Sequence, residues 1–234
     1  MNWLAEIIAD CALTEDVEDY LLGRGAKEET IRAEGFVTWK PSAKPIPDET
    51  FCKRYGLHGE RIEGYLVTPV RSPKGGLIGF EARCIHQKLI SDYRLPEAAW
   101  NPFWLGTRRA MPKIWAGGDV WITEGLFDLC PLEWAVPSKD AVLASVRARL
   151  SRSHVEFLRR FCRGWVNMVY DRDTAGRQGT VGWVDETGKR RYGAVDNLRR
   201  AGLTCRDVAY HGGKDPGEIW NSGGVKAIQA AFPI

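Results

Sequence analysis

Apolar residues recur along the first half of the chain in two patterns. Between residues 61 and 85 they alternate with polar residues on either side of the turn S-P-K-G-G (72–76), which predicts a β-hairpin. Residues 4–22 carry apolar positions at helical spacing, which predicts one helix that ends at Gly23. Residues 40–50 contain three prolines and predict an extended connection. The first half therefore combines helices with antiparallel strands.

From residue 117 onward, apolar runs of strand length alternate with helical segments. The expected strands are 119–123, 141–146 and 165–170, and the expected helices are 125–135 and 153–162. Ser153 and Glu156 match the capping box of the second helix. A hairpin is expected around E-T-G (186–188) within residues 179–193, and a helix from about Val195. Alternating strands and helices favour a parallel sheet flanked by helices.

Composition restricts the class of protein. The chain has 234 residues, of which 44% are hydrophobic and 27% charged, as in globular proteins that bury a core. The N-terminus has no basic region and no apolar run reaches membrane-spanning length, so we expect a cytoplasmic protein without membrane contact. Six cysteines are scattered without a C-x-x-C pair, which favours free thiols in a reducing compartment and no zinc site. Because the net charge is only +3, nucleic-acid binding would depend on local clusters of basic residues.

Two acidic clusters follow apolar strands. The run V-N-M-V-Y-D-R-D (166–173) ends in Asp171 and Asp173, which we expect on the same side because strand side chains alternate. The run D-V-W-I-T-E-G-L-F-D (119–128) contains Glu124 and Asp128, four residues apart and therefore on one face of the predicted helix. Carboxylates that converge at the carboxyl ends of strands form a site suited to Mg²⁺. The alternative is two ordinary strands followed by solvated acids.

The two acidic segments resemble the Toprim signature, in which Glu-Gly follows one strand and Asp-x-Asp follows a later one. The runs E-G-L-F-D (124–128) and D-R-D-T-A-G-R (171–177) resemble bacterial-type DNA primases in particular. The resemblance implies a Toprim catalytic domain over 117–234, preceded by a basic α+β primase subdomain over 1–116. It also implies that Glu124, Asp171 and Asp173 bind Mg²⁺ or Mn²⁺, with Asp128 and Asp215 as further catalytic acids.

Basic residues in several segments are candidate contacts for nucleic acid or nucleoside triphosphates. L-L-G-R-G (21–25) resembles the entry segment of the family, and the predicted hairpin over 61–85 resembles a family hairpin that ends in a cleft arginine, matched by Arg83. H-G-G-K-D-P-G (211–217) resembles the family's Gly-Lys-Asp-Pro-Asp loop, with Gly217 in place of the second acid. The most basic stretch follows the strand at 141–146, and arginine forks suit phosphates. The candidates are Arg24, Arg71, Arg83, Arg147, Arg149, Arg177 and Lys214, and solvated surface charge is the alternative for each.

The function implied by the resemblance is DNA-directed synthesis of RNA primers. Such an enzyme joins ribonucleoside triphosphates on a single-stranded DNA template by metal-dependent nucleotidyl transfer. The family's zinc ribbon and helicase-binding domain are not recognised here, which implies a compact phage or mobile-element version that works with a replicative helicase or a separate zinc module. Two family lysines are replaced by Asp92 and Leu105. A Toprim nuclease and a non-catalytic single-strand-binding or replisome adaptor are the alternatives.

Overall fold

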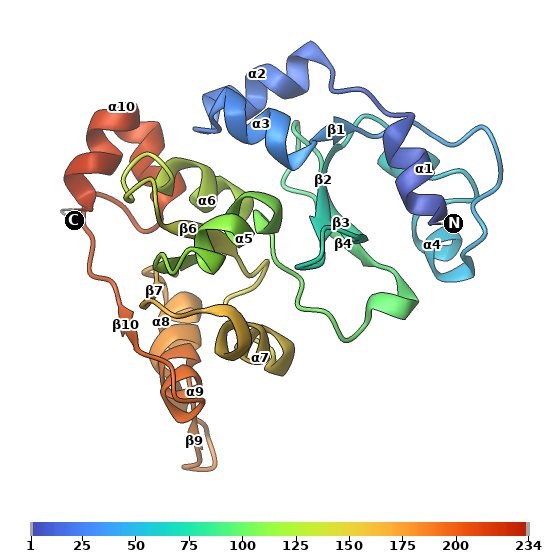
Figure 1. The fold of residues 1–234 in the computed structure, drawn as a ribbon. Helices are drawn as coiled ribbons and strands as arrows, with labels where there is room; N and C mark the ends of the chain where they lie inside the picture. The colour runs from blue at the N-terminus through green and yellow to red at the C-terminus, as the bar shows by residue number, and fades with distance from the viewer. Residues whose placement is uncertain (1, 233–234) are drawn as a thin grey trace. The chain divides into compact units, whose positions relative to one another are not determined.

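Residues 2–232 are described by the computed structural model, in which the chain forms two compact units (Figure 1). The first comprises Met1–Gly23 and Glu28–Asn101, and the second comprises Arg24–Lys27 and Pro102–Ile234. The expected boundary between residues 116 and 117 stays a prediction, and residues 102–116 group with the second unit in this division. None of the helices within residues 2–232 is both long and apolar enough to cross a bilayer.

The first unit is built around a four-stranded antiparallel sheet. Its strands are paired in the order β1 (Val37–Thr38), β2 (Leu66–Arg71), β3 (Leu77–Arg83) and β4 (Ile90–Arg94). The predicted hairpin is confirmed, since β2 and β3 pair around the turn at 72–76. Its helices are α1 (Trp3–Ala9), α2 (Glu15–Gly23), α3 (Glu28–Glu34) and α4 (Glu49–Tyr55), with 3-10 turns at Glu60–Ile62 and Pro96–Ala98.

The single helix predicted over residues 4–22 is wrong, because the helix is interrupted between Ala9 and Glu15. The residues between the two helices form hydrogen bonds with the segment that contains β1. The Thr38 N–H donates to the Ala12 carbonyl at 2.9 Å, and the Thr14 N–H donates to the Thr38 hydroxyl at 3.0 Å. Apolar spacing continued across the break, so the sequence pattern did not reveal these long-range bonds.

Aromatic side chains form the core of the first unit. Phe51 is completely buried, and its ring centroid lies 4.8 Å from that of Tyr55 and 5.1 Å from that of Tyr93. Trp39 and Phe80 extend the same cluster, with ring centroids 5.5 Å apart. The aromatic residues of this unit therefore serve mainly to cover one face of the antiparallel sheet.

The N-terminal half of the chain is not basic, contrary to expectation. Residues 1–116 contain 16 Lys and Arg and 16 Asp and Glu, whereas residues 117–234 contain 17 and 14. Acidic residues in the first turns of α2 and α3 offset the basic residues elsewhere in the first half. The whole net charge of +3 therefore comes from residues 117–234.

The second unit contains a four-stranded parallel sheet flanked by helices, which confirms the predicted fold class. Its strands are paired in the order β10 (Cys205–Asp207), β7 (Val166–Met168), β5 (Val120–Thr123) and β6 (Ala141–Ala144). Its helices are α5 (Thr107–Trp115), α6 (Leu126–Leu132), α7 (Arg152–Phe161), α8 (Thr174–Val181), α9 (Ala194–Arg200) and α10 (Pro216–Ala231).

Both faces of the parallel sheet are covered. Val120 and Ile122 of β5 belong to one buried cluster that also contains apolar residues of α5, α7 and α9. The alternate side chains, such as Trp121, point to the other face, where α6 packs on β5 and β6 and α10 packs on α6. Because β6 and β7 flank β5 on opposite sides, right-handed crossovers require α6 and α7 on opposite faces.

Two local predictions in this unit need correction. The predicted capping box of Ser153 and Glu156 is wrong, because α7 begins one residue earlier and is capped by Ser151, with His154 completing the box. The hairpin is shorter than residues 179–193, since α8 continues to Val181 and the strands are β8 (Trp183–Val184) and β9 (Arg190–Arg191).

Replacing Phe51 by alanine is expected to lower the free energy of unfolding by about 3–5 kcal/mol, because it leaves a cavity among packed rings. Leu57 is 51% exposed, and Leu57→Ala serves as the control with an expected change within about 0.5 kcal/mol. Urea denaturation followed by tryptophan fluorescence measures both. Equal losses for the two variants would show that the aromatic cluster does not dominate this unit.

Candidate active site

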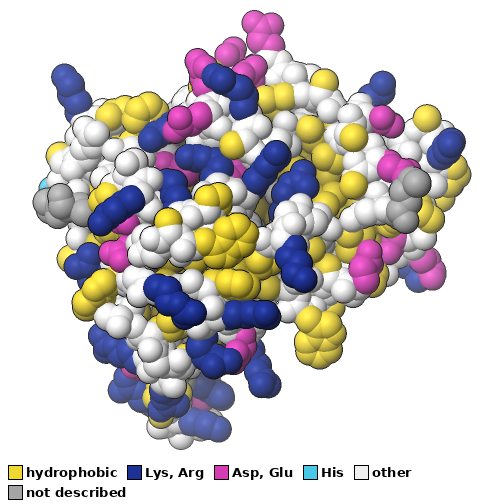
Figure 2. Space-filling model, in the orientation of Figure 1, with side chains coloured by type: hydrophobic (Ala, Val, Ile, Leu, Met, Phe, Trp, Pro, Cys, Tyr) yellow, Lys and Arg dark blue, Asp and Glu magenta, His cyan; other side chains and the backbone are white. Residues whose placement is uncertain are grey.

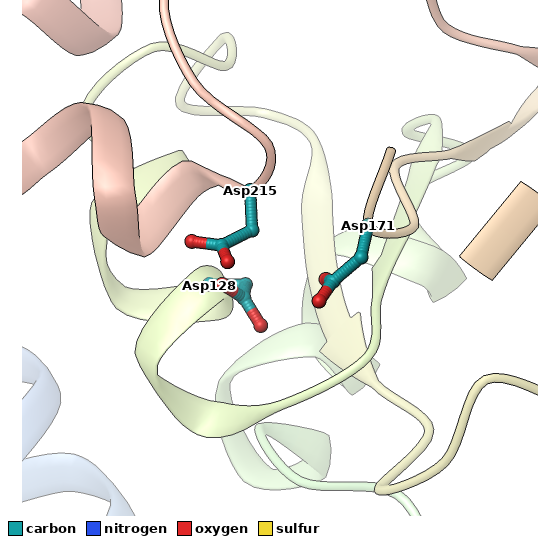
Figure 3. A group of neighbouring side chains, drawn as sticks. All are labelled: Asp128, Asp171 and Asp215. Atoms are coloured by element: carbon teal, nitrogen blue, oxygen red, sulfur yellow. The ribbon is translucent and has the colours of Figure 1, made fainter. Parts of the chain in front are cut away.

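Three carboxylates meet at the carboxyl ends of the parallel strands in the second unit (Figure 3). Asp128 lies in the first turn of α6, Asp171 follows β7, and Asp215 is the N-cap residue of α10. One oxygen from each lies within 4.8 Å of the other two, and all three side chains are partly buried. The chain leaves the adjacent strands β5 and β7 in opposite directions, and parallel sheets bind ligands at such positions.

Backbone N–H groups hold two of these carboxylates. Asp128 Oδ1 accepts a hydrogen bond from the Gly217 N–H at 3.3 Å, and Asp215 Oδ1 accepts one from the Glu218 N–H at 2.6 Å. A Cβ at position 217 would lie 2.7 Å from the Phe127 carbonyl oxygen, so only glycine lets α10 begin this close to α6. This close approach accounts for glycine at position 217, where the loop that the sequence resembles carries a second acid.

Glu124 lies beside the three aspartates. Its Oε1 accepts a hydrogen bond from the Asp171 N–H at 3.1 Å, which joins the end of β5 to the end of β7. The prediction that Glu124 and Asp128 share a helix face is wrong, because α6 starts after Gly125 and Glu124 precedes it. The hydrogen bond to Asp171, rather than helical spacing, brings Glu124 to the site.

Asp173 has a different environment from Asp171. The strand expected over residues 165–170 is observed as β7, which ends at Met168. The two acids therefore lie in the following loop and not at alternating strand positions as expected. The exposed Asp173 carboxylate accepts the Gly176 N–H at 2.9 Å and caps α8. The predicted metal ligands Glu124, Asp171 and Asp173 therefore stay a prediction, while the geometry groups Asp171 with Asp128 and Asp215.

The electrostatics of the cluster oppose ionisation of its members. Burial raises the pKa of Asp128 to about 8, and the charges of Asp215 and Asp171 add to the shift. Burial, with the Asp171 charge next, raises the pKa of Glu124 to about 7. Burial, with the Asp215 charge next, raises the pKa of Asp171 to about 6. When these four neighbouring carboxyl groups are ionised, the positive charge around them is not enough to balance theirs.

These residues fit a divalent metal ion. All the donor atoms are carboxylate oxygens, which Mg²⁺ and Mn²⁺ prefer to nitrogen or sulfur. A cation would also counteract the burial and the mutual repulsion that raise the pKa values of Asp128 and Asp171. Asp128, Asp171 and Asp215 are therefore the residues best placed to hold such an ion.

Basic and aromatic groups surround the cluster within the second unit. Lys214 forms an ion pair with Asp215, with Nζ 3.4 Å from Oδ2. The Arg24 guanidinium lies over the Phe127 ring at 4.8 Å, next to the residue that precedes Asp128. Gly25, which follows Arg24, has a φ of +86° and packs on Trp220. In this Arg-Gly pair the glycine therefore permits a backbone turn, and the arginine provides the charge.

Sequence reasoning missed Arg172, which lies between the two acids of D-R-D. Its guanidinium stacks over Tyr210 at 4.2 Å, and its N–H donates to the Lys214 carbonyl at 2.7 Å. The Tyr210 hydroxyl lies 2.9 Å from the Tyr170 carbonyl oxygen, which ties the same two loops together. The position of Arg172 between the candidate ligands Asp171 and Asp173 was the sequence signal that could have identified it.

The remaining basic candidates of this unit lie on the surface. Arg147 and Arg149 are exposed, and they follow Val146, whose φ of +66° turns the chain away from the end of β6. The Arg149 guanidinium stacks on Trp183 of the hairpin at 4.6 Å. Arg177 is exposed on α8. Burial raises the pKa of Asp207, and the charges of Arg172 and Arg177 oppose that rise.

The two arginines of the first unit do not lie together. Arg83 pairs with Leu66 at one end of the β2–β3 ladder, and Arg71 pairs with Leu77 at the other, about 17 Å away for five strand residues. Arg71 donates to the Gly75 carbonyl at 3.2 Å, and Arg83 lies 3.8 Å from the buried Glu81 carboxylate. They therefore cannot bind the same phosphate.

Known proteins of similar sequence and structure are primases. A DNA primase from Deinococcus radiodurans is 24% identical over 234 residues, which cover 92% of this chain and 39% of that protein. The zinc-binding and RNA polymerase domains of the Aquifex aeolicus primase match 97% of this chain and 60% of theirs, with a TM-score of 0.68 and 20% identity. A DnaG primase catalytic domain bound to single-stranded DNA matches 97% of this chain and 75% of its own, with a TM-score of 0.64 and 18% identity.

The chain has the fold of a bacterial-type primase catalytic core. The resemblance drawn from E-G-L-F-D and D-R-D-T-A-G-R is confirmed by these relatives and by the fold. No family model matches the chain. The chain spans about two fifths of the length of the Deinococcus primase, so the activity of the whole relative does not transfer directly.

The melting temperature of the metal-free protein is expected to fall as the pH rises from about 5 to about 8. The raised pKa values of Glu124, Asp128 and Asp171 mean that the folded state holds protons that the unfolded chain has already lost. The associated stability is complete below the ordinary pKa values and is lost as the pH rises through the raised ones. Mg²⁺ added at about pH 8 is expected to raise the melting temperature, because it binds the folded state only.

The variant Asp128→Asn is expected to flatten this pH dependence and to reduce the response to Mg²⁺. Glu186→Gln, at the exposed turn between β8 and β9, removes one acid elsewhere and is expected to behave as wild type. Thermal denaturation at several pH values, with and without Mg²⁺, measures both effects. An unchanged pH dependence in Asp128→Asn would contradict the electrostatic description of the cluster.

Proposed function

We propose that this chain is a primase that synthesises short RNA primers on single-stranded DNA from ribonucleoside triphosphates. The observation that carries the proposal is the convergence of Asp128, Asp171 and Asp215 at the carboxyl ends of parallel strands in a primase-core fold. Sequence similarity to a named DNA primase supports the same function. A structural neighbour bound to single-stranded DNA supports the choice of template.

Asp128, Asp171 and Asp215 would hold Mg²⁺ or Mn²⁺. When bound, the metal would align the primer 3′-hydroxyl with the α-phosphate and neutralise charge during transfer. Asp171 belongs both to the ligand set predicted from sequence and to the observed cluster. Glu124 orients the backbone at Asp171 through its hydrogen bond and adds negative charge beside it.

Cationic residues near this cluster would bind triphosphate or template phosphates. Lys214 already lies against Asp215, and Arg172 lies on the loop between Asp171 and Asp173. Arg24 is oriented by Phe127 next to Asp128. We assign Arg71 and Arg83 of the first unit, and Arg147 and Arg177 of the second, to separate contacts along the nucleic acid.

Asp171→Asn and Asp128→Asn are each expected to reduce primer synthesis on the order of 100-fold or more, because each removes a carboxylate charge that would hold the metal ion at the reacting phosphate. The assay combines single-stranded DNA, labelled ribonucleotides and Mg²⁺ or Mn²⁺, and it detects short, template-dependent products that resist DNase. Circular dichroism checks that the variants fold, and Glu186→Gln is the matched control.

The same assay separates the alternatives. Wild-type yields from Asp171→Asn would refute the assigned site. Metal-dependent cleavage of the DNA without synthesis would identify a nuclease. Absence of metal-dependent activity on any template would favour a non-catalytic adaptor.

We further propose that a replicative helicase or a separate zinc module holds the template for this chain. The net charge of +3 provides little general attraction for DNA, so binding is expected to weaken steeply as salt rises. A partner that holds the DNA would raise the effective template concentration. Primer yield at physiological salt, with and without the partner, tests this, and efficient initiation by the isolated chain would contradict it.

A further inference from the structure

The β8–β9 hairpin lines a surface pocket that the proposed active site does not use. The pocket has a volume of about 400 Å³ and lies between the hairpin, α8, α9 and the loop that precedes α7. None of the four clustered acids lines it. Its charged and aromatic lining consists of Arg149, Lys189, Arg190, Arg191, Trp183 and Tyr192.

Close backbone contacts build this pocket. A Cβ at Gly179 would collide with the Ala148 carbonyl, so glycine allows α8 to lie directly against the loop that carries Arg149. At the base of the hairpin, a Cβ at Gly182 would collide with the Arg191 carbonyl, and one at Gly193 with the Thr180 carbonyl. These contacts fix the stem of the hairpin and place Trp183 under the Arg149 guanidinium, 4.6 Å away.

Polar contacts order the rest of the hairpin. Asp185 Oδ1 accepts hydrogen bonds from the Thr187 hydroxyl at 2.6 Å and from the Lys189 N–H at 3.0 Å. Arg191 and Arg190 form ion pairs with Asp185 and Asp196, at 2.8 and 3.2 Å. The ion pairs found among residues 2–232 include neither Arg149 nor the Lys189 ammonium, so these two charges remain available to a ligand.

The charge of the region is concentrated around this pocket. Residues 177–200 contain six Lys and Arg and three Asp and Glu, a surplus as large as that of the whole chain. Figure 2 shows Lys and Arg side chains gathered at the lower left, where Figure 1 places α8, α9 and β9. A surface with this charge attracts polyanions and repels cationic ligands.

The chemistry of the lining selects among polyanions. Exposed aromatic rings beside phosphate-binding cations are typical of single-stranded nucleic-acid sites, because bases stack on rings while the backbone follows the positive charge. In this pocket the cations are spread over two segments, Arg149 on one side and Lys189 to Arg191 on the other. That spread suits a strand with successive phosphates better than one compact triphosphate.

We propose that this pocket binds one nucleotide of a single-stranded DNA segment. The base packs against Trp183, and the flanking phosphates contact Arg149 and Lys189. α8 leads from this pocket to Asp173, its N-cap residue beside the acidic cluster, over eight residues or about 12 Å. Identifying the strand as a primer template rests on the proposed function, whereas binding of the strand does not.

The first test measures binding of a fluorescent oligothymidylate by anisotropy, without metal or nucleotides. Trp183→Ala is expected to weaken binding by about 5- to 150-fold, which is the loss of one base–aromatic stack, while Trp183→Phe retains most of the affinity. The double variant Arg149→Ala/Lys189→Ala is expected to lower the slope of log affinity against log salt by about 1.4, or about 0.7 for each lost phosphate contact.

The second unit provides a matched control outside the pocket lining. Trp165 is 46% exposed, and the Arg206 guanidinium lies over its ring at 5.7 Å, so the pair has the same chemistry as Trp183 with Arg149. Trp165→Ala is expected to leave affinity and salt dependence unchanged. A second variant deletes residues 183–192 and joins Gly182 to Gly193, since a Cβ on Gly182 would lie 2.8 Å from the Gly193 nitrogen. It removes Lys189 together with Trp183, so it is expected to bind more weakly than Trp183→Ala and with a lower salt slope, with α8 and α9 intact by circular dichroism.

The outcomes distinguish this inference from the proposed function. Loss of binding in Trp183→Ala but not in Trp165→Ala supports the pocket, even if the chain synthesises no primers. The pocket is overturned, even if primers are made, if Trp183→Ala and the deletion variant keep their affinity and Arg149→Ala/Lys189→Ala keeps its salt slope. Full competition by free nucleotides at concentrations where oligonucleotides compete, or preference for oligouridylate over oligothymidylate, also overturns the proposed DNA strand.

Discussion

The burial of neighbouring carboxylates, together with their mutual repulsion, is the constraint on which the second unit depends. Asp128, Asp171 and Asp215 come from three separate segments, and Glu124 adds a fourth acid through the Asp171 N–H. No single segment could hold these charges together, because each would turn toward water. The parallel sheet provides the necessary rigidity by delivering the ends of β5 and β7 side by side. Holding the acids together therefore lowers the stability of the folded state, and a bound cation would offset this loss.

A framework of buried polar contacts resists that repulsion. The Tyr210 hydroxyl lies within hydrogen-bond distance of the carbonyl oxygens of Tyr170 and Lys214, which joins the loop after β7 to the loop before α10. The Ser145 hydroxyl lies 2.8 Å from the buried Tyr170 hydroxyl and links the end of β6 to the same region. These tyrosines hold the loops in place from beneath, so the acids cannot separate without breaking buried hydrogen bonds.

Positive and negative groups occupy different ends of α8. The acids lie at its N-terminal end, and the cationic hairpin pocket lies at its C-terminal end. Separation by one short helix keeps most arginines from neutralising the acidic cluster, while both remain within reach of one nucleic-acid strand. Arg24, Arg172 and Lys214 lie at the acidic end instead. Lys214 pairs with Asp215 directly, but this pair is largely solvent-exposed on the lysine side and therefore weak.

Much of the second unit was determined by local sequence. Apolar runs of strand length predicted β5, β6 and β7, and their alternation with helices predicted a parallel sheet, because side-chain periodicity is a property of neighbouring residues. The position of Glu124 directly after β5, and that of Asp171 in the loop after β7, followed from the same patterns. The hairpin turn at 186–188 was also visible, since Gly188 and its polar neighbours favour a turn whatever surrounds them.

The identity of the converging acids was decided only by the tertiary structure. Asp171 and Asp173 look equivalent in D-R-D, but the early end of β7 lets the Asp173 carboxylate cap α8 while Asp171 faces Asp128 and Asp215. In the sequence, Gly217 is notable only because an acid was expected there. The packing of α10 on α6 reveals that a glycine is needed at this position for the two helices to approach closely. Likewise Arg149 was a candidate phosphate contact after the strand at 141–146, and only the fold places it against Trp183. Spacing along the chain specifies which face a side chain takes within one element, but contacts between distant elements depend on strand order and on where each loop leaves the sheet.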